Sequence, residues 1–97
     1  MKKKTNYNYN YVFLFYDVGE KRVNKVFKKC KKYLHHWQKS VFRGEITSAK
    51  IIELESELKK IINSDEDFIS IIKMIPLNSV GETIIGKEKA NTENLFI

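Results

Sequence analysis

One carboxylate stands at the end of a continuous apolar run near the beginning of the chain. The run extends from Tyr11 to Tyr16, and Asp17 follows it directly. Consecutive aromatic and aliphatic residues predict a buried strand. A charged carboxylate there needs an ion-pair partner, a helix to cap or a cation to hold. Two interpretations therefore stay open: Asp17 caps the helix that begins at Gly19, or it is a metal ligand.

The metal interpretation requires two copies of the chain. Mg²⁺ (or Mn²⁺) prefers oxygen ligands and often takes one or two carboxylates, with waters and substrate phosphates completing its coordination. A single Asp17 makes a poor site, whereas two Asp17 side chains meeting at a dimer axis would form an adequate one. Such a site could activate water and stabilise charge at a phosphodiester. By strand alternation, Tyr16 faces the opposite side from Asp17, where core packing is the simpler role.

A run of basic residues without an acid is the second candidate. It predicts one surface of a helix, because an apolar stripe of Val23, Val26, Phe27, Cys30 and Leu34 recurs at spacings of three and four. The uncompensated charge favours binding of phosphates, which gives affinity without sequence information. Arg43, beside Gly44, adds a further phosphate-binding group near the sheet. The basic residues are Lys21, Arg22, Lys25, Lys28, Lys29, Lys31 and Lys32.

Composition supports a nucleic-acid partner and excludes several other classes. The net charge of +6 in 97 residues indicates an anionic partner. Cys30 is the single cysteine, so disulfide frameworks and multi-cysteine zinc sites are excluded, and a reducing cytoplasm is expected. No stretch is long and apolar enough to span a membrane, and the Lys2–Lys4 run precedes polar residues rather than the core of a signal peptide.

Two other polar clusters are interpreted structurally. His35 and His36 lack a third ligand at a suitable spacing and point to opposite sides of a strand, so surface or packing roles are favoured. The acidic cluster at 65–67 lacks the spacing and glycine of an EF-hand loop, which favours a solvated turn. The sequence contains no P-loop, dinucleotide-binding or nucleophile-elbow motif.

The elements that must position these residues form a βαββαβ pattern. After a polar tail at 1–8, strands are expected over 9–17, on both sides of a break near Lys39-Ser40 within 35–46, over 68–75, and briefly over 82–85. The helices are expected from Gly19 and from the N-cap Thr47, where Ile46 and Ile51 form a hydrophobic staple. This order predicts an α+β, ferredoxin-like sandwich over 9–86, with both helices on one face of an antiparallel sheet.

The sheet face without helices predicts a homodimer. An apolar face of that size, bare in a monomer, usually marks an interface. The remaining residues, 87–97, form an extension that ends in Leu95, Phe96 and Ile97. Three apolar residues at a C-terminus need a surface to bury against, and a neighbouring chain is expected to provide it.

Four short motifs in this order and spacing resemble one family. They are Tyr16-Asp17-Val18, Lys21-Arg22, the segment Gln38-x-Ser40-Val41-Phe42-x-Gly44-Glu45, and Ile85-Gly86-Lys87. Together they resemble CRISPR-associated protein two, the small ferredoxin-like subunit of the spacer-acquisition machinery. The resemblance covers roughly residues 11–97. The chain departs from it in having His36 where some relatives carry an arginine, and in its lysine-rich N-terminal extension.

The resemblance implies a prokaryotic, cytoplasmic homodimer with two possible roles. One is a metal-dependent endonuclease acting on RNA or DNA, with catalytic residues falling on Asp17, Tyr16, Arg22, Ser40 and Phe42. The other is an architectural role, in which the dimer binds DNA and bridges dimers of the integrase subunit, CRISPR-associated protein one. A non-catalytic ferredoxin-like nucleic-acid-binding or regulatory module is the alternative outside this family.

Overall fold

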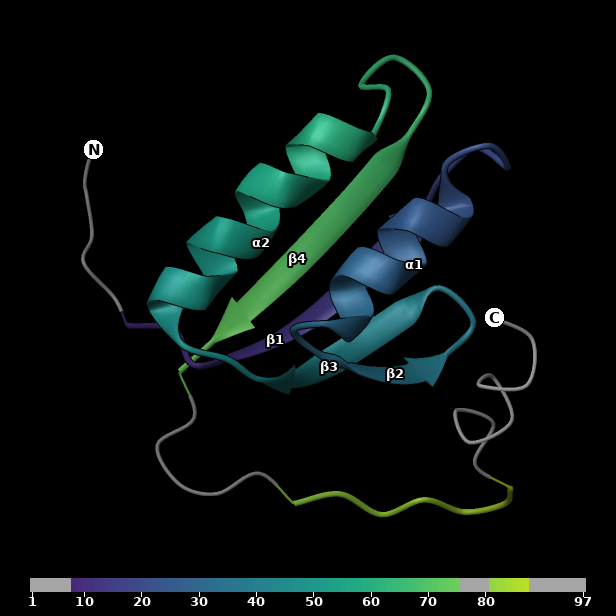
Figure 1. Cartoon of the computed structure of the whole chain (residues 1–97). Helices are drawn as coiled ribbons and strands as arrows, with labels where there is room; N and C mark the ends of the chain where they lie inside the picture. Colours follow the sequence, from purple (N-terminus) through teal and green to yellow (C-terminus); the bar gives the residue numbers. More distant parts are fainter. Residues whose placement is uncertain (1–7, 76–80, 88–97) are drawn as a thin grey trace.

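Between residues 8 and 75, the chain forms a four-stranded antiparallel sheet with two helices on one face (Figure 1). The computed structural model describes residues 8–75 and 81–87, so most of the predicted tail and the whole of Leu95–Ile97 lie outside the described residues. The sheet order is β2-β3-β1-β4, which is the ferredoxin-like arrangement predicted from the sequence. The elements are β1 (Tyr11–Asp17), α1 (Val23–Lys31), β2 (His35–Gln38), β3 (Val41–Glu45), α2 (Ser48–Ile61) and β4 (Phe68–Met74).

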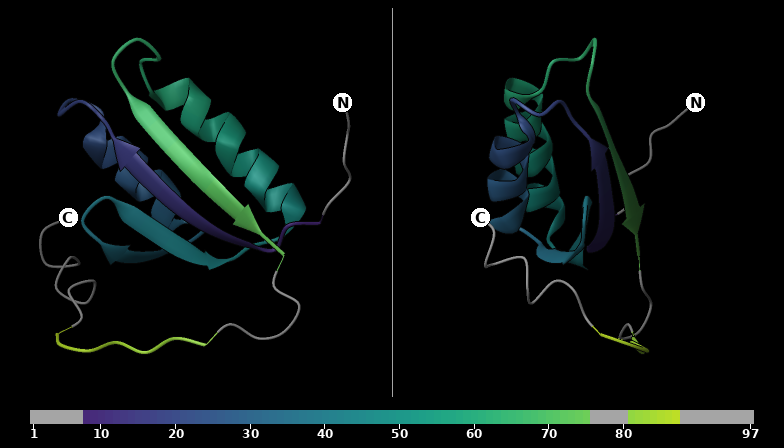
Figure 2. Two further views of the ribbon diagram at one scale, coloured as in Figure 1. Left: turned by 180° about the vertical axis from the view of Figure 1, so that it is seen from behind. Right: turned by 90° about the vertical axis from the view of Figure 1, so that its right-hand side faces the viewer.

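The side view in Figure 2 shows the helix layer on one side of the sheet. The core is formed by buried side chains from both layers. Alternation along β1 buries Val12, Leu14 and Tyr16 against the helices and turns the intervening residues to the other face. The apolar stripe predicted for α1 supplies Val26, Phe27 and Cys30 to the core. The stripe of α2 supplies Ile51, Leu54 and Leu58.

The turn between β2 and β3 forms where the sequence predicted it. Lys39 takes a left-handed conformation with φ of 43°, and the His36 Nε2–H donates to its carbonyl at 2.7 Å. The His36 ring is buried between Phe27 and Phe42, with centroids 4.7 and 4.9 Å away, which confirms a packing role. Gly44 has φ of 152°, and a Cβ there would lie 3.3 Å from His35 Cδ2, so β2 and β3 approach each other closely at this position.

Two predicted element starts and one predicted strand are wrong. β1 begins at Tyr11 rather than at 9, and α1 begins at Val23 rather than at Gly19. The second difference arises because Arg22 N and Val23 N both donate to the Gly19 carbonyl, which makes residues 20–22 a turn. The described segment 81–87 contains no strand, in contrast to the strand expected at 82–85. The Thr47 cap is confirmed, since its side chain accepts from Lys50 N at 3.2 Å.

Candidate functional site

Asp17 lies on the sheet face that no helix covers. The β1–β4 ladder pairs Asp17 with Phe68, Phe15 with Ser70 and Phe13 with Ile72, and paired residues point to the same side. On this face Phe15, Phe68 and Ile72 are 37%, 59% and 50% exposed. The bare apolar face predicted from the sequence is therefore present, and Asp17 stands at its end, two residues beyond Phe15, the last aromatic residue of β1 on this face.

The capping interpretation of Asp17 is wrong. The N-cap of α1 is Arg22, and no side chain caps this helix. Asp17 is exposed, so its carboxylate is accessible to a cation from solvent. Within the two described ranges, no group of three or more His, Cys, Asp or Glu side chains is placed to hold a metal ion. Asp17 by itself supplies Mg²⁺ with one carboxylate, which is the right donor type for this ion, and a second copy of the chain would add another.

The loop after Asp17 is held by a buried acid that the sequence reasoning missed. The Asp67 side chain is fully buried, although 65–67 was expected to be a solvated turn. Asp67 Oδ1 accepts from Gly19 N at 2.8 Å, and Asp67 Oδ2 accepts from Arg22 Nε at 2.5 Å and from Asn63 N at 2.8 Å. The hydrogen bond from Arg22 holds the pKa of Asp67 well below its usual range, and the pKa of Arg22 is raised in turn.

The structure does not bring together all the catalytic residues that the resemblance implies. Phe42 is fully buried, Tyr16 is 6% exposed, and their rings stack on the helix side at 6.2 Å. Ser40 lies in the β2–β3 turn, and its carbonyl accepts from Tyr16 N at 3.1 Å. Arg22 has its guanidinium engaged by Asp67 and by Glu66 at 2.9 Å. The structure thus places Asp17 on the open face, with the Tyr16 and Phe42 rings on the opposite side of the sheet.

The basic surface is smaller than the sequence suggests. Lys29 pairs with Glu57 of α2 at 3.2 Å, and Arg22 pairs with the 66–67 turn. Lys31 lies 5.7 Å from the centre of the buried Phe27 ring. In the described part of the chain, no ion pair is formed by the four exposed lysines that recur at spacings of four, three and four residues. They are Lys21, Lys25, Lys28 and Lys32.

Arg43 lies on the open face, on the same side as Asp17. Its guanidinium lies 4.5 Å from the centre of the Trp37 ring and pairs with Glu82. The Trp37 ring meets Phe13 edge-on, with centroids 6.2 Å apart. Arg43 is thus a cation fixed by stacking, and binding of a phosphate there would have to displace Glu82.

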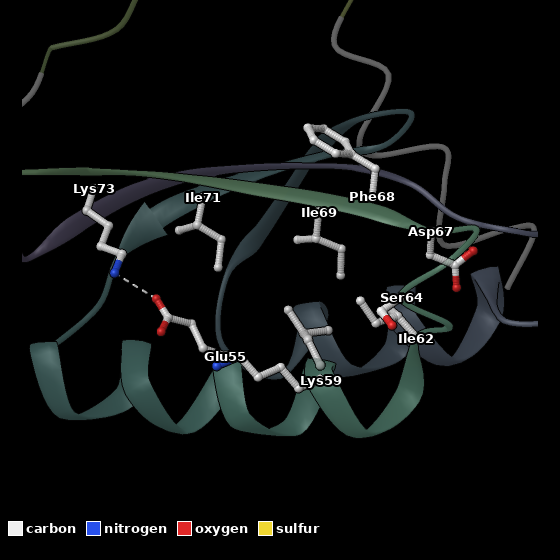
Figure 3. A pocket seen from close by; sticks show the side chains of 10 residues that line it. Glu55, Lys59, Ile62, Ser64, Asp67, Phe68, Ile69, Ile71 and Lys73 are labelled. Atoms are coloured by element: carbon white, nitrogen blue, oxygen red, sulfur yellow. Dashed lines mark ion pairs between the residues drawn. The ribbon is translucent and has the colours of Figure 1, made fainter.

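A separate groove of about 440 Å³ runs between α2 and β4 (Figure 3). Its walls are mainly apolar, with Leu58 and Ile62 on one side and Ile69 and Ile71 on the other. An ion pair between Lys73 and Glu55, 2.8 Å long, crosses it. Ile69 and Ile71 belong to the helix side of β4, so the groove and the Asp17 carboxylate open on different faces of the sheet.

Comparison with known proteins identifies the family. Residues 10–80 match the family model described as CRISPR associated protein Cas2. A relative from Thermodesulfovibrio yellowstonii, named CRISPR-associated endoribonuclease Cas2 3, is 40% identical over 81 residues, which cover 84% of this chain and 92% of the relative. A second, from Dictyoglomus turgidum and named CRISPR-associated endoribonuclease Cas2, is 40% identical over 88% of this chain and 98% of its own.

Solved structures agree with the sequence relatives. A crystal structure of Cas2 that is 40% identical superposes with a TM-score of 0.71, over 84% of this chain and 91% of that one. The structure of Streptococcus pyogenes Cas2 at pH 6.5 is 26% identical and gives a TM-score of 0.62, over 73% of this chain and 99% of that one. Among the residues described here, no helix has the length and apolar character needed to cross a membrane.

Proposed function

Because this chain belongs to the Cas2 family of CRISPR-associated proteins, we propose that it is an endonuclease that cuts phosphodiester bonds of RNA or DNA as a homodimer. The relatives named as endoribonucleases support the activity. The observation that carries the proposal is the exposed Asp17 carboxylate at the end of the bare apolar sheet face. Chemistry and dimerisation would then use the same surface.

The dimer is proposed to form through this face. Phe15, Phe68 and Ile72 leave a third to more than half of their surface open to water in one chain, and their burial would favour association. Pairing the faces would bring a second Asp17 toward the first. The two carboxylates would hold Mg²⁺ or Mn²⁺, whose chemistry at this position is to activate water and neutralise charge at the phosphodiester.

Replacing Asp17 by Asn tests the catalytic role. The amide keeps the shape of the side chain but loses the charge, so we expect cleavage of labelled RNA and DNA with Mn²⁺ or Mg²⁺ to fall at least about 100-fold. The dimer should persist in light-scattering runs, because the apolar face is unchanged. Asp65→Asn, which removes an exposed carboxylate from the 63–67 turn, is the matched control. Cleavage by Asp17→Asn at the wild-type rate would contradict the proposal, as would a monomer at micromolar concentration.

An architectural role in spacer acquisition is the second proposed function. The four unpaired lysines of the α1 side would bind the phosphates of duplex DNA, and the dimer would bridge integrase subunits, CRISPR-associated protein one. Leu95, Phe96 and Ile97, outside the described residues, are proposed to pack on a neighbouring chain. Their deletion should weaken either the dimer or integrase binding. If both are unchanged, this assignment fails.

The salt dependence of duplex binding tests the lysine surface. Each phosphate contact contributes about 0.9 to the slope of log affinity against log salt, so replacing Lys21, Lys25 and Lys28 by Gln should flatten the slope by about 2 to 3. The control replaces Lys50, Lys59 and Lys60 of α2, which removes the same charge from a helix with mixed charges. Equal slopes for both triple variants would show that only net charge matters.

A further inference from the structure

Asp67 joins two turns that are far apart in the sequence. Each of its carboxylate oxygens accepts two hydrogen bonds, all from nitrogen donors. Oδ1 accepts from Gly19 N at 2.8 Å and from Arg22 Nη2 at 3.0 Å, and Oδ2 accepts from Arg22 Nε and Asn63 N. A carboxylate with no exposed surface and four donors is fully satisfied, so this arrangement is rigid.

The two turns meet beside Asp17. Gly19 is two residues after Asp17, and Asp67 directly precedes Phe68, which is the ladder partner of Asp17. The Asp17–Phe68 pair is the last one in the β1–β4 ladder. The end of a two-stranded ladder opens readily because it lacks a following pair. Asp67, next to the first residue of β4, holds this end of the ladder together by accepting a hydrogen bond from the backbone of Gly19, just after β1.

A side chain at position 19 would displace the Arg22 guanidinium from its present place. A Cβ at position 19 would lie 2.6 Å from Arg22 Nη2 and 3.5 Å from Asp67 Oδ1. The Gly19 carbonyl also accepts from Arg22 N at 2.9 Å, which fixes the turn that presents the arginine to Asp67. The backbone of residue 19, the guanidinium of Arg22 and the carboxylate of Asp67 therefore form one packed unit.

We infer that Asp67, acting through Gly19 and Arg22, is a positioning residue that sets where the Asp17 carboxylate points on the open sheet face. The inference rests on the proposed role of Asp17 as a ligand. Asp17 is exposed, so no packing around its side chain fixes it, and its direction follows from the backbone at the end of β1. Displacements of about 1 Å at a reacting group can cost about 100-fold in rate. In this arrangement Arg22 acts indirectly, because its guanidinium binds Asp67 and not the substrate or metal.

Asp67→Asn is the sharpest perturbation. Each Asp67 oxygen accepts from two donors. In the asparagine variant an NH₂ group replaces one of these oxygens and cannot accept, so two of the four hydrogen bonds are lost. Arg22→Lys is the second variant, since it leaves the Asp67–Gly19 bond in place and serves if the first variant is too unstable. Glu66→Gln is the matched control, because it removes an exposed partner of the same arginine and leaves Asp67 untouched.

Two readouts are measured on the full chain. The first is exchange of the Gly19 amide hydrogen without metal, which should be at least about tenfold faster in Asp67→Asn. The second is a Mn²⁺ titration, followed both by cleavage of labelled RNA and by broadening of the Val18 amide signal. For Asp67→Asn, we expect the Mn²⁺ concentration that gives half-maximal cleavage, and the one that gives half-maximal broadening, to rise at least about tenfold. The KM for RNA should stay within twofold of wild type. Glu66→Gln should match wild type. Arg22→Lys should lie between wild type and Asp67→Asn in both readouts.

Two different results would overturn the inference and can be told apart. If Asp67→Asn loses protection of the Gly19 amide but keeps the wild-type Mn²⁺ dependence, Asp67 only stabilises the fold. If Asp17→Asn itself shows the same broadening and cleavage as wild type, the proposed function of Asp17 fails first, and the inference falls with it.

Discussion

Replacing Phe42 separates a core role from a catalytic one. The ring is fully buried, with centroids 4.9 Å from His36, 5.1 Å from Phe27 and 6.2 Å from Tyr16. Phe42→Ala should cost about 3–5 kcal/mol, a large share of the roughly 5–15 kcal/mol that holds a domain folded. Phe42→Leu keeps most of the volume and loses the ring contacts, so about 1–2 kcal/mol is expected. For a domain of this size, that loss lowers Tm by about 5–15 °C.

The assay uses the single tryptophan of the chain. Trp37 fluorescence follows urea unfolding at one fixed protomer concentration, because a dimer makes the midpoint depend on concentration. The control is Ile52→Ala on α2, where the residue is 67% exposed and the change should be small. Cleavage by Phe42→Leu, measured where the protein is still folded, should stay within twofold of wild type. Lost cleavage with unchanged stability would refute the core role and would mean that Phe42 acts on the substrate.

Two further predictions follow from ionisable groups. The Arg22 hydrogen bond lowers the pKa of Asp67 below its ordinary value of 3.8, so its contribution to stability is complete above that value and is lost as pH falls toward the lowered pKa. Urea midpoints should therefore drop more steeply below about pH 4 for wild type than for Asp67→Asn, and equal slopes would contradict this. Burial raises the pKa of the Cys30 thiol to about 12. A disulfide reagent at about pH 8 should react with Cys30 only after unfolding, and rapid reaction of the native protein would contradict its burial.

Local patterns were sufficient for most of the fold. The alternation at Tyr16 and Asp17, the apolar stripe of α1 and the Thr47 cap each depend on residues within a few positions of one another, and they appear in the structure as predicted. The bare sheet face could also be predicted, because a βαββαβ order leaves one face without helices. The start of α1 could not, since the turn that delays it depends on the Gly19 carbonyl receiving two donors.

The contacts around the candidate site were harder to predict from the sequence, because the residues that form them are far apart in the chain. Asp67 lies 48 positions from Gly19 and 45 from Arg22, so no local spacing indicates their contact. One signal did exist: Asp67 borders the apolar run of β4 as Asp17 borders that of β1, and a charged residue beside a buried strand needs a partner. The same reasoning applied to both acids would have set Asp67 apart from the solvated Asp65.

The basic run shows how distant acids change the meaning of a local charge count. No acid lies among its seven cations in the sequence, yet Glu57, Glu66 and Asp67 reach it from later elements and pair with Lys29 and Arg22. The unpaired lysines lie in α1 or directly beside it in the sequence, whereas Asp17 lies on the other face of the sheet. Figure 2 shows both helices on one side of the sheet. The proposed phosphate binding by the lysines and the proposed chemistry at Asp17 would therefore use different surfaces of one chain. For this reason Asp17→Asn should abolish cleavage and leave the salt slope of duplex binding intact, whereas the lysine variants should flatten that slope without removing the ligand at Asp17.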